Sequence, residues 1–351
     1  MVSMNYLLLM TLGGSGLLIG YLVWEKVFQK FMTQSMAYAA LITVLLTFLM
    51  PWGWLKRIYR KVLIAFWVDG VLGGSKGLVN IADLRTEESV YRTNDYQFLV
   101  IFAAVWFIGA SFIMIIKMLR YLNLRHELQA LSIDCGDNSL DEIVERLRKE
   151  LRCRCKPNVA WTRAENKTFT LGAIRPIIFL QKDYTDEELY WILKHEMTHI
   201  VRRDLLIKIL LEFVGCLYWF NPFIYVLTDK LGSVCETSCD EQVMKGCSER
   251  EREIYIKLLD GNKDDKRVKA PLCSALEDGN GDIDKRIRLL ETAEKISGKK
   301  KLFATIIFVL LVFVDSLMAF AYPKVQHVEN AVVETAEDAI DGNNFWAYDY
   351  V

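Results

Sequence analysis

Two histidines and one glutamate have the spacing of a metal site that activates water. They are His195, Glu196 and His199, in the pattern His-Glu-x-x-His. On a helix, side chains four residues apart point to the same side, so both imidazoles can bind one metal ion. The carboxylate of Glu196 would then reach a water on that ion and act as a general base. The chain has only four histidines, which argues against an incidental pair on a surface helix.

If the metal is a catalytic zinc ion, it needs a third protein ligand and an open position for water. The two remaining histidines are poorly placed, because one lies near a membrane boundary and the other beyond the last apolar segment. A carboxylate is the better candidate, and Glu236 stands 37 residues after His199. From a second helix Glu236 could complete the site, while Asp240, one turn later, could hydrogen-bond a ligand imidazole. Glu241 follows directly, so spacing alone leaves open a solvated acidic face.

The segments around these residues carry the signals of a domain with both helices and strands. The capping box from Thr185 to Glu188 predicts a helix that runs to about Asp204. Residues 159–181 have a β-like pattern, in which Pro176 favours a hairpin or an edge strand because proline cannot donate to a ladder. Apolar periodicity and polar flanks predict further helices at about 138–152, 229–246, 249–260 and 282–297. Residues 261–282 have the composition of an exposed loop.

The composition combines apolar segments with a charged globular part. The 351 residues include 43 Lys and Arg against 44 Asp and Glu, and this balance argues against a nucleic-acid-binding protein. Hydrophobic residues make up 52% of the chain although 25% of its residues are charged. Four segments are long and apolar enough to cross a bilayer, at about 5–24, 35–55, 97–117 and 302–323. The first lacks a basic leader and a cleavage site, so we expect a retained helix there and not a signal peptide.

Lysines and arginines beside the third and fourth segments predict the orientation of the chain. We expect a membrane region at 1–118 with an outer loop at 56–96, a cytoplasmic domain at 119–301, a fourth transmembrane helix at 302–323 and a short extracellular tail at 324–351. Both termini would then lie outside the cell. A further apolar run at about 205–228 carries Lys208 and Glu212 and is broken by Asn221-Pro222. It is typical of a buried or membrane-grazing helix, and the sequence leaves open whether it crosses the membrane.

The eight cysteines lie mostly in the part predicted to be cytoplasmic, where a reducing environment favours free thiols. Two pairs could bind a metal, Cys153 with Cys155 and Cys235 with Cys239. Neither pair has the usual two-residue spacing of a metal site. Free buried cysteine is therefore the preferred interpretation.

Four motifs together carry a resemblance to a known family. They read Gly172-Ala-Ile-Arg-Pro-x-Ile178-x-Leu180, His195-Glu-x-x-His-x-x-Arg-x-Asp204, Trp219-Phe-Asn-Pro222 and Glu236-x-x-Cys-Asp240. They cover about residues 160–245 and resemble the membrane metallopeptidases of the β-lactam-responsive signal transducers, the BlaR/MecR type. The order of three apolar segments before the domain and one after it extends the resemblance to about residues 1–322.

The resemblance implies a fold, a cofactor and site residues. The fold is a mainly α-helical membrane protein with about four transmembrane helices and an inserted cytoplasmic α+β domain, a gluzincin-like zinc protease carrying a small β-sheet. The cofactor is Zn²⁺, with His195, His199 and Glu236 as ligands and Glu196 as the catalytic base. The resemblance also implies that Asp240 supports a ligand, and that Asp204 is a structural residue near the end of the active-site helix.

The implied function is regulatory proteolysis in signal transduction. The substrate would be a cytoplasmic transcriptional repressor, the protein itself or both, with 261–282 as the natural position for self-cleavage. Arg175, Ile178 and Tyr225 are candidate substrate contacts, and the 168–180 hairpin could accept substrate as an added strand. Expected partners are the lipid bilayer, the protein substrate and a second copy in a homodimer, with no direct contact to nucleic acid.

One departure from the family pattern and two alternative functions limit this interpretation. The family carries a penicillin-binding sensor domain after its fourth transmembrane helix, whereas residues 322–351 contain no Ser-x-x-Lys motif. We therefore do not expect direct acylation by β-lactams. A general quality-control zinc protease of membrane proteins also uses His-Glu-x-x-His with a distant glutamate, so it stays an alternative. A zinc-binding receptor or scaffold without catalysis is a further alternative, which the presence of Glu196 disfavours.

Overall fold

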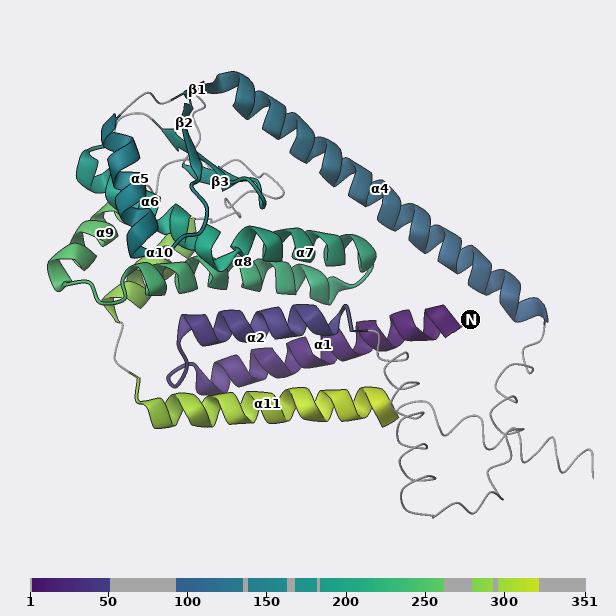
Figure 1. Ribbon diagram of the computed structural model, residues 1–351. Coiled ribbons are helices and arrows are strands. Elements are labelled where there is room, and N and C mark those ends of the chain that lie inside the picture. Colours follow the sequence, from purple (N-terminus) through teal and green to yellow (C-terminus); the bar gives the residue numbers. More distant parts are fainter. Residues whose placement is uncertain are drawn as a thin grey trace, which may run out of the picture.

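The computed structural model describes residues 2–50, 93–134, 138–162, 168–181, 184–261, 280–292 and 296–321. Most of the predicted outer loop, most of the 261–282 loop and the whole predicted tail lie outside this part. The described residues are mainly helical and carry a small sheet, in agreement with the predicted class (Figure 1).

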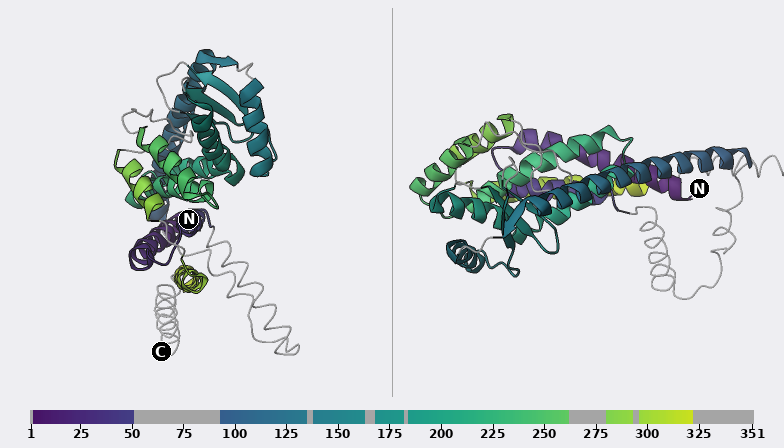
Figure 2. Two further views of the ribbon diagram at one scale, coloured as in Figure 1. Left: turned by 90° about the vertical axis from the view of Figure 1, so that its left-hand side faces the viewer. Right: turned by 90° about the horizontal axis from the view of Figure 1, so that it is seen from above.

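Three helices from the two ends of the chain run side by side (Figures 1 and 2). They are α1 (Val2–Phe28), α2 (Gln34–Thr47) and α11 (Gly298–Ala321). Leu18 and Leu41 are fully buried between them, and Trp24 Nε1 donates to the carbonyl oxygen of Ala304 at 3.1 Å. Helix α2 ends before residue 55, where the second predicted segment ended, and residues 51–55 lie outside the described part.

Helix α4 (Thr93–Leu131) is the longest described helix and runs obliquely to α1, α2 and α11 in Figure 1, with contacts to α7 and to the sheet. Within the stretch Val100–Ala130, an 18-residue segment has a mean hydropathy of 2.3, and only 6% of this segment is buried. Within the described residues, it is the one helix long and apolar enough to cross a membrane. The helix runs past residue 117, the predicted end of the segment, and Leu128 packs on the sheet against Phe179.

The sheet has the strand order β1-β2-β4-β3. Its strands are β1 (Ser132–Asp134), β2 (Asn158–Thr162), β3 (Phe169–Leu171) and β4 (Ile177–Gln181). The antiparallel β3–β4 pair confirms the predicted hairpin, and the parallel β2–β4 pair makes β4 an inner strand and β3 an edge strand. Helix α5 (Asn138–Glu150) packs on the sheet together with α6 (Asp186–Arg202), burying Leu147, Ile178 and Leu193 completely.

The helices after the sheet begin and end at recognisable signals. The predicted capping box is confirmed, because Thr185 Oγ1 accepts from the Glu188 N–H and the Glu188 carboxylate accepts from the Thr185 N–H. Helix α6 ends at Arg202, since Arg203 takes a left-handed conformation with φ of 60°. The chain then turns directly into α7 (Asp204–Leu217).

The prediction of one helix over 205–228 is wrong. The apolar run is divided between α7 and α8 (Pro222–Val243), which also contains most of the separate helix predicted at 229–246. The division has a local cause: the Asn221 side chain accepts from the Phe223 N–H at 3.0 Å and Pro222 occupies the first turn, so a new helix starts there. Helices α9 (Glu249–Gly261) and α10 (Asn280–Glu291) complete the part that packs around α6 and α8.

A test of this local structure is the substitution Gly172→Ala in the β3–β4 turn. Gly172 has φ of +91°, and an added Cβ would lie 2.6 Å from the Arg175 carbonyl oxygen. We expect a loss of about 3 kcal/mol of stability, because backbone strain and a clash act together. Gly246 is the matched control, since its φ is +83° but nothing lies within 4 Å. Thermal unfolding should show a larger fall in Tm for Gly172→Ala, and equal shifts would contradict the close approach.

Candidate metal centre

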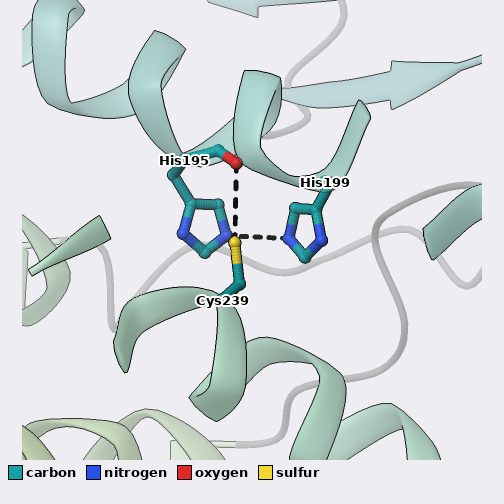
Figure 3. Close-up of side chains that lie close together, drawn as sticks. All are labelled: His195, His199 and Cys239. Atoms are coloured by element: carbon teal, nitrogen blue, oxygen red, sulfur yellow. Dashed lines mark hydrogen bonds between the residues drawn. The ribbon is translucent and has the colours of Figure 1, made fainter. Parts of the chain in front are cut away.

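Helix α6 buries the His-Glu-x-x-His residues on one side. His195, Glu196 and His199 are 9%, 7% and 4% exposed. The two imidazole Nε2 atoms lie only 3.0 Å apart, as Figure 3 shows. The helical spacing of four residues therefore brings the two nitrogens to one point, as predicted.

Helix α8 brings Glu236 to the same point. Its Oε2 atom lies 3.4 Å from His195 Nε2 and 3.6 Å from His199 Nε2. In a tetrahedral site with bonds of about 2.0–2.1 Å, ligand atoms stand about 3.3 Å from one another. The three measured separations scatter around this value, so the donor set has the dimensions of a divalent metal site.

Asp204 fixes the ring of His199. Its Oδ2 atom lies 2.7 Å from His199 Nδ1, and its Oδ1 atom accepts from the Tyr38 hydroxyl at 2.8 Å. An ionised carboxylate can only accept, so Nδ1 carries a hydrogen and Nε2 is the ring nitrogen turned toward the centre. Asp204 was expected, with Asp240, to support the ligands from near the end of the active-site helix, and the structure places it in direct contact with His199.

His195 is held through a tyrosine. Its Nδ1 atom lies 2.9 Å from the Tyr255 hydroxyl oxygen, and that hydroxyl donates to Asp240 Oδ1 at 2.6 Å. Asp240 itself lies 3.3 Å from Nδ1. Arg286 donates to both carboxylate oxygens of Asp240, from Nε at 2.6 Å and from Nη2 at 2.8 Å. The expected contact of Asp240 with an imidazole is thus made chiefly through Tyr255.

Positive charges around the centre favour the ionised form of three carboxylates, namely the candidate ligand Glu236 and the supporting residues Asp204 and Asp240. Burial alone would raise the pKa of Glu236, but His199 and His195 lower it well below its ordinary value. Burial would likewise raise the pKa of Asp240, which Arg286 and His195 instead hold below its ordinary value. Asp204 follows the same rule, because His199 and Arg202 lower its pKa against the effect of burial.

The surroundings of the Glu236 carboxylate oxygens bear on whether a metal fits this site. Oε1 is buried and has no hydrogen-bond partner among the described residues, and Lys208 Nζ lies 3.6 Å away from it. An ionised carboxylate buried with an unbonded oxygen is costly unless a cation compensates it. Lys208 is the cation beside Oε1, whereas Oε2 lies beside both imidazoles, and this set of two nitrogens and one carboxylate oxygen fits a bound divalent metal.

Glu196 points to the sheet and does not share the ligand position of Glu236. Its Oε2 atom accepts from the Thr170 hydroxyl at 2.7 Å. Thr170 is the central residue of β3, so the edge strand and the carboxylate next to the metal position are joined directly. This contact gives Glu196 a fixed orientation beside the place where a substrate strand could pair.

Cys239 is a second possible donor at the centre. Its sulfur and the ring nitrogens of His195 and His199 all lie within 4.8 Å of one another. Its thiol also faces the carbonyl oxygen of His195 at 3.6 Å, as drawn in Figure 3. Burial would raise the pKa of Cys239, but the two histidines lower it. The six described cysteines are all free, so a thiol near the metal position is a real competitor of Glu236.

The three candidate substrate contacts are not brought to the centre. Ile178 is fully buried in the core, and its strand is paired on both sides, so this prediction is wrong. Tyr225 precedes Glu236 by eleven residues on α8, a rise of about 16 Å, and donates to the Trp219 carbonyl oxygen, so it is wrong too. Arg175 is exposed in the β3–β4 turn, and no contact with the centre was found for it among the described residues.

A comparison with known protein families finds a peptidase family over the part of the chain that contains this centre. The sequence model of the BlaR1 peptidase M56 family matches residues 5–290. The chain belongs to the M56 peptidase family. This membership confirms the predicted resemblance and indicates a peptidase that uses a metal ion.

Individual M56 relatives are similar over part of the chain. The regulatory protein BlaR1 of Bacillus licheniformis is 29% identical over 147 residues, which is 41% of this chain and 24% of that protein. The methicillin resistance mecR1 protein of Staphylococcus aureus is 21% identical over 193 residues, 54% of this chain and 32% of that protein. The chain thus matches a quarter to a third of the length of these relatives.

The support of His195 can be tested with Tyr255→Phe, which removes one hydroxyl. The ring would lose the partner that orients it, so we expect metal affinity to fall about tenfold, as is usual when a partner of a metal ligand is lost. Competition with a coloured chelator measures this affinity. Tyr190→Phe is the control, because its hydroxyl bonds Glu150 away from the centre. Unchanged affinity in Tyr255→Phe would contradict the assigned support.

Proposed function

We propose that this protein is an integral-membrane zinc endopeptidase that acts in signal transduction. The observation that carries the proposal is the convergence of His195 Nε2, His199 Nε2 and Glu236 Oε2, 3.0–3.6 Å from one another, in a member of a peptidase family. A non-catalytic receptor would have no need of Glu196, which lies beside the three donors with its own fixed partner.

Each residue of the centre has a proposed role. His195, His199 and Glu236 would hold Zn²⁺, which when bound would polarise a carbonyl group and lower the pKa of water so that it becomes a stronger nucleophile. Glu196 accepts the proton of the attacking water and delivers it to the leaving amine. The Thr170 hydroxyl donates to one oxygen of Glu196 and so fixes the orientation of this carboxylate.

The edge strand β3 is the proposed docking position of the substrate backbone. Its inner side pairs with β4, and Thr170 links it to Glu196. An extended peptide that added to the outer edge of β3 would gain backbone hydrogen bonds independent of its side chains. Its scissile bond would then pass beside the carboxylate of Glu196.

The proposed placement in the cell follows from the apolar helices and the charges beside them. Helix α4 supports a membrane position, since it is long, apolar and exposed. Lys117, Arg120 and Arg125 follow its apolar part, and three lysines at positions 299–301 form the start of α11, so the domain between them lies in the cytoplasm. We retain four transmembrane helices with both termini outside as the proposed topology.

The proposed substrate class is regulatory. The relatives are named as a regulatory protein and a methicillin resistance protein, which favours a dedicated target over general degradation of membrane proteins. We propose a cytoplasmic transcriptional repressor, the protein itself, or both. Residues 262–279 of the suspected self-cleavage loop lie outside the described part of the chain.

The substitution Glu196→Gln tests the proposed reaction. It keeps the size and hydrogen bonding of the side chain but removes the base, so we expect proteolysis to fall about 100-fold or more while zinc stays bound. Sequencing of new N-termini in cells that express the wild type or the variant would identify the substrates. Glu187→Gln, at an exposed position of the same helix, is the control. Equal cleavage by Glu196→Gln and the wild type would overturn the proposal.

Self-cleavage requires a separate test. If the 261–282 loop is cut in cis or by a second copy, the wild-type protein should yield a new N-terminus within this loop and Glu196→Gln should not. Co-expression of a tagged Glu196→Gln chain with the untagged wild type separates the two routes, because only cleavage between copies would cut the tagged chain. Equal processing of wild type and variant would assign the cut to another protease.

A further inference from the structure

The hairpin formed by α7 and α8 has an apolar tip that the described part of the chain covers only in part. No acidic or basic side chain occurs over residues 213–228. Large apolar side chains on this hairpin are between 38% and 59% exposed, namely Leu206, Ile209, Phe213, Phe220, Tyr225 and Val226. An exposed apolar surface of this extent marks a contact with something other than water.

Two ion pairs mark where this apolar part begins and ends. On the α7 side Glu212 bonds Lys117, the residue that ends the uncharged segment of α4. On the α8 side Lys230 bonds Glu25 at 2.8 Å, and Glu25 ends the uncharged segment of α1. The boundary between charged and apolar side chains therefore lies at the same level in the hairpin and in the two predicted membrane helices.

The turn of the hairpin lies well below that level. Gly109 of α4 faces Trp219 so closely that an added Cβ would lie 3.0 Å from the indole. Asn221 Nδ2 donates to Ser15 of α1 at 2.9 Å. Gly109 is eight residues from Lys117, or about 12 Å along α4, and Ser15 is ten residues from the charged end of α1, or about 15 Å. A bilayer core about 30 Å thick has its middle about 15 Å deep.

Three backbone carbonyl groups at the turn are paired within the protein. The carbonyl oxygens of residues 217–219 accept from Trp106 Nε1 at 2.7 Å, the Asn221 N–H at 2.8 Å and the Tyr225 hydroxyl at 2.7 Å. Irregular backbone is tolerated at membrane depth only when its polar groups are paired within the protein. Tyr225, which lies too far from the centre to contact substrate, has a structural role here because its hydroxyl pairs a carbonyl group of the turn.

Both ends of the hairpin return to the metal centre. Helix α7 begins at Asp204, which bonds His199, and α8 carries Glu236 back to the same point. We propose that α7 and α8 form a re-entrant membrane hairpin, whose exposed apolar side chains contact lipid acyl chains near the middle of the bilayer. It enters and leaves on the cytoplasmic side. This inference rests on the proposed membrane position of α4 and is independent of proteolysis.

The hairpin ties the metal centre to the membrane surface. Asp204 precedes Glu212 by eight residues, so the centre lies within about 12 Å of the level of the ion pairs. A scissile bond must come that close to the membrane. The substrate class is therefore an extended segment that can approach the membrane surface, such as a loop of a membrane protein or a flexible arm of a soluble one.

Depth-dependent fluorescence quenching tests the hairpin. A fluorescent amino acid would replace one residue at a time in the full chain, reconstituted in vesicles of phosphatidylcholine and phosphatidylglycerol. Some vesicles carry lipids spin-labelled near the headgroup and others near the end of the acyl chain. The test positions are Phe213 and Phe220, and Phe107 on α4 is the membrane control. Ile174, which is 90% exposed in the β3–β4 turn, is the aqueous control. Zinc binding by each variant verifies its fold.

We expect the acyl-chain label to quench Phe220 about twofold more than the headgroup label, because its depth is near that of the bilayer middle. Phe213, close to Glu212, should respond more to the headgroup label. Quenching of Phe107 without quenching of Phe220 would overturn the hairpin and leave α4 as a membrane helix. Stronger quenching of Phe220 by the headgroup label would show a surface position and overturn it too. If neither Phe107 nor Phe220 responds, the membrane placement and the hairpin both fail.

Discussion

Burial of negative charge around two imidazoles is the constraint on which this structure depends. Glu196, Asp204, Glu236 and Asp240 are each no more than 7% exposed, and a buried carboxylate is tolerated only when it is paired and hydrogen-bonded. Tyr38 comes from α2 and bonds Asp204, while Tyr255 and Arg286 come from α9 and α10 and bond Asp240. Lys208 and Arg286 lie 3.6 Å and 3.7 Å from the Glu236 carboxylate, and a metal ion between the imidazoles would add a directly bound cation. The helices outside the motif are thus required because they provide these partners.

The sequence predicted those parts of the centre that local spacing determines. His195 and His199 converge because they are one turn apart, and the capping box at Thr185 begins their helix as expected. Tyr255, Arg286 and Thr170 were not predicted, since nothing in a periodic pattern tells which distant polar side chains meet. Ile178 was misjudged for a related reason: the parallel pairing of β2 with β4 joins segments far apart in sequence and buries a strand that locally resembles an edge.

The membrane part and the metal centre are joined by specific contacts. Tyr38 of α2 bonds the carboxylate that orients His199, and Ser35 and Gln34 of the same helix bond Glu241 and Thr237 on α8. A movement of α2 along α8 would therefore disturb both helices that carry the candidate ligands. In the proposed membrane position, the apolar hairpin would anchor the opposite ends of α7 and α8. Such a connection is what a protease controlled through its membrane helices would require.

The identity of the metal ligands decides the account most directly, because Cys239 lies close enough to compete with Glu236. X-ray absorption at the zinc edge of the purified, zinc-loaded protein distinguishes them. We predict nitrogen and oxygen neighbours at about 2.0–2.1 Å, with two imidazoles and no sulfur, and the loss of one oxygen ligand in Glu236→Ala. A sulfur neighbour at about 2.3 Å that disappears in Cys239→Ser would contradict the assignment of His195, His199 and Glu236 as the ligands of this protein.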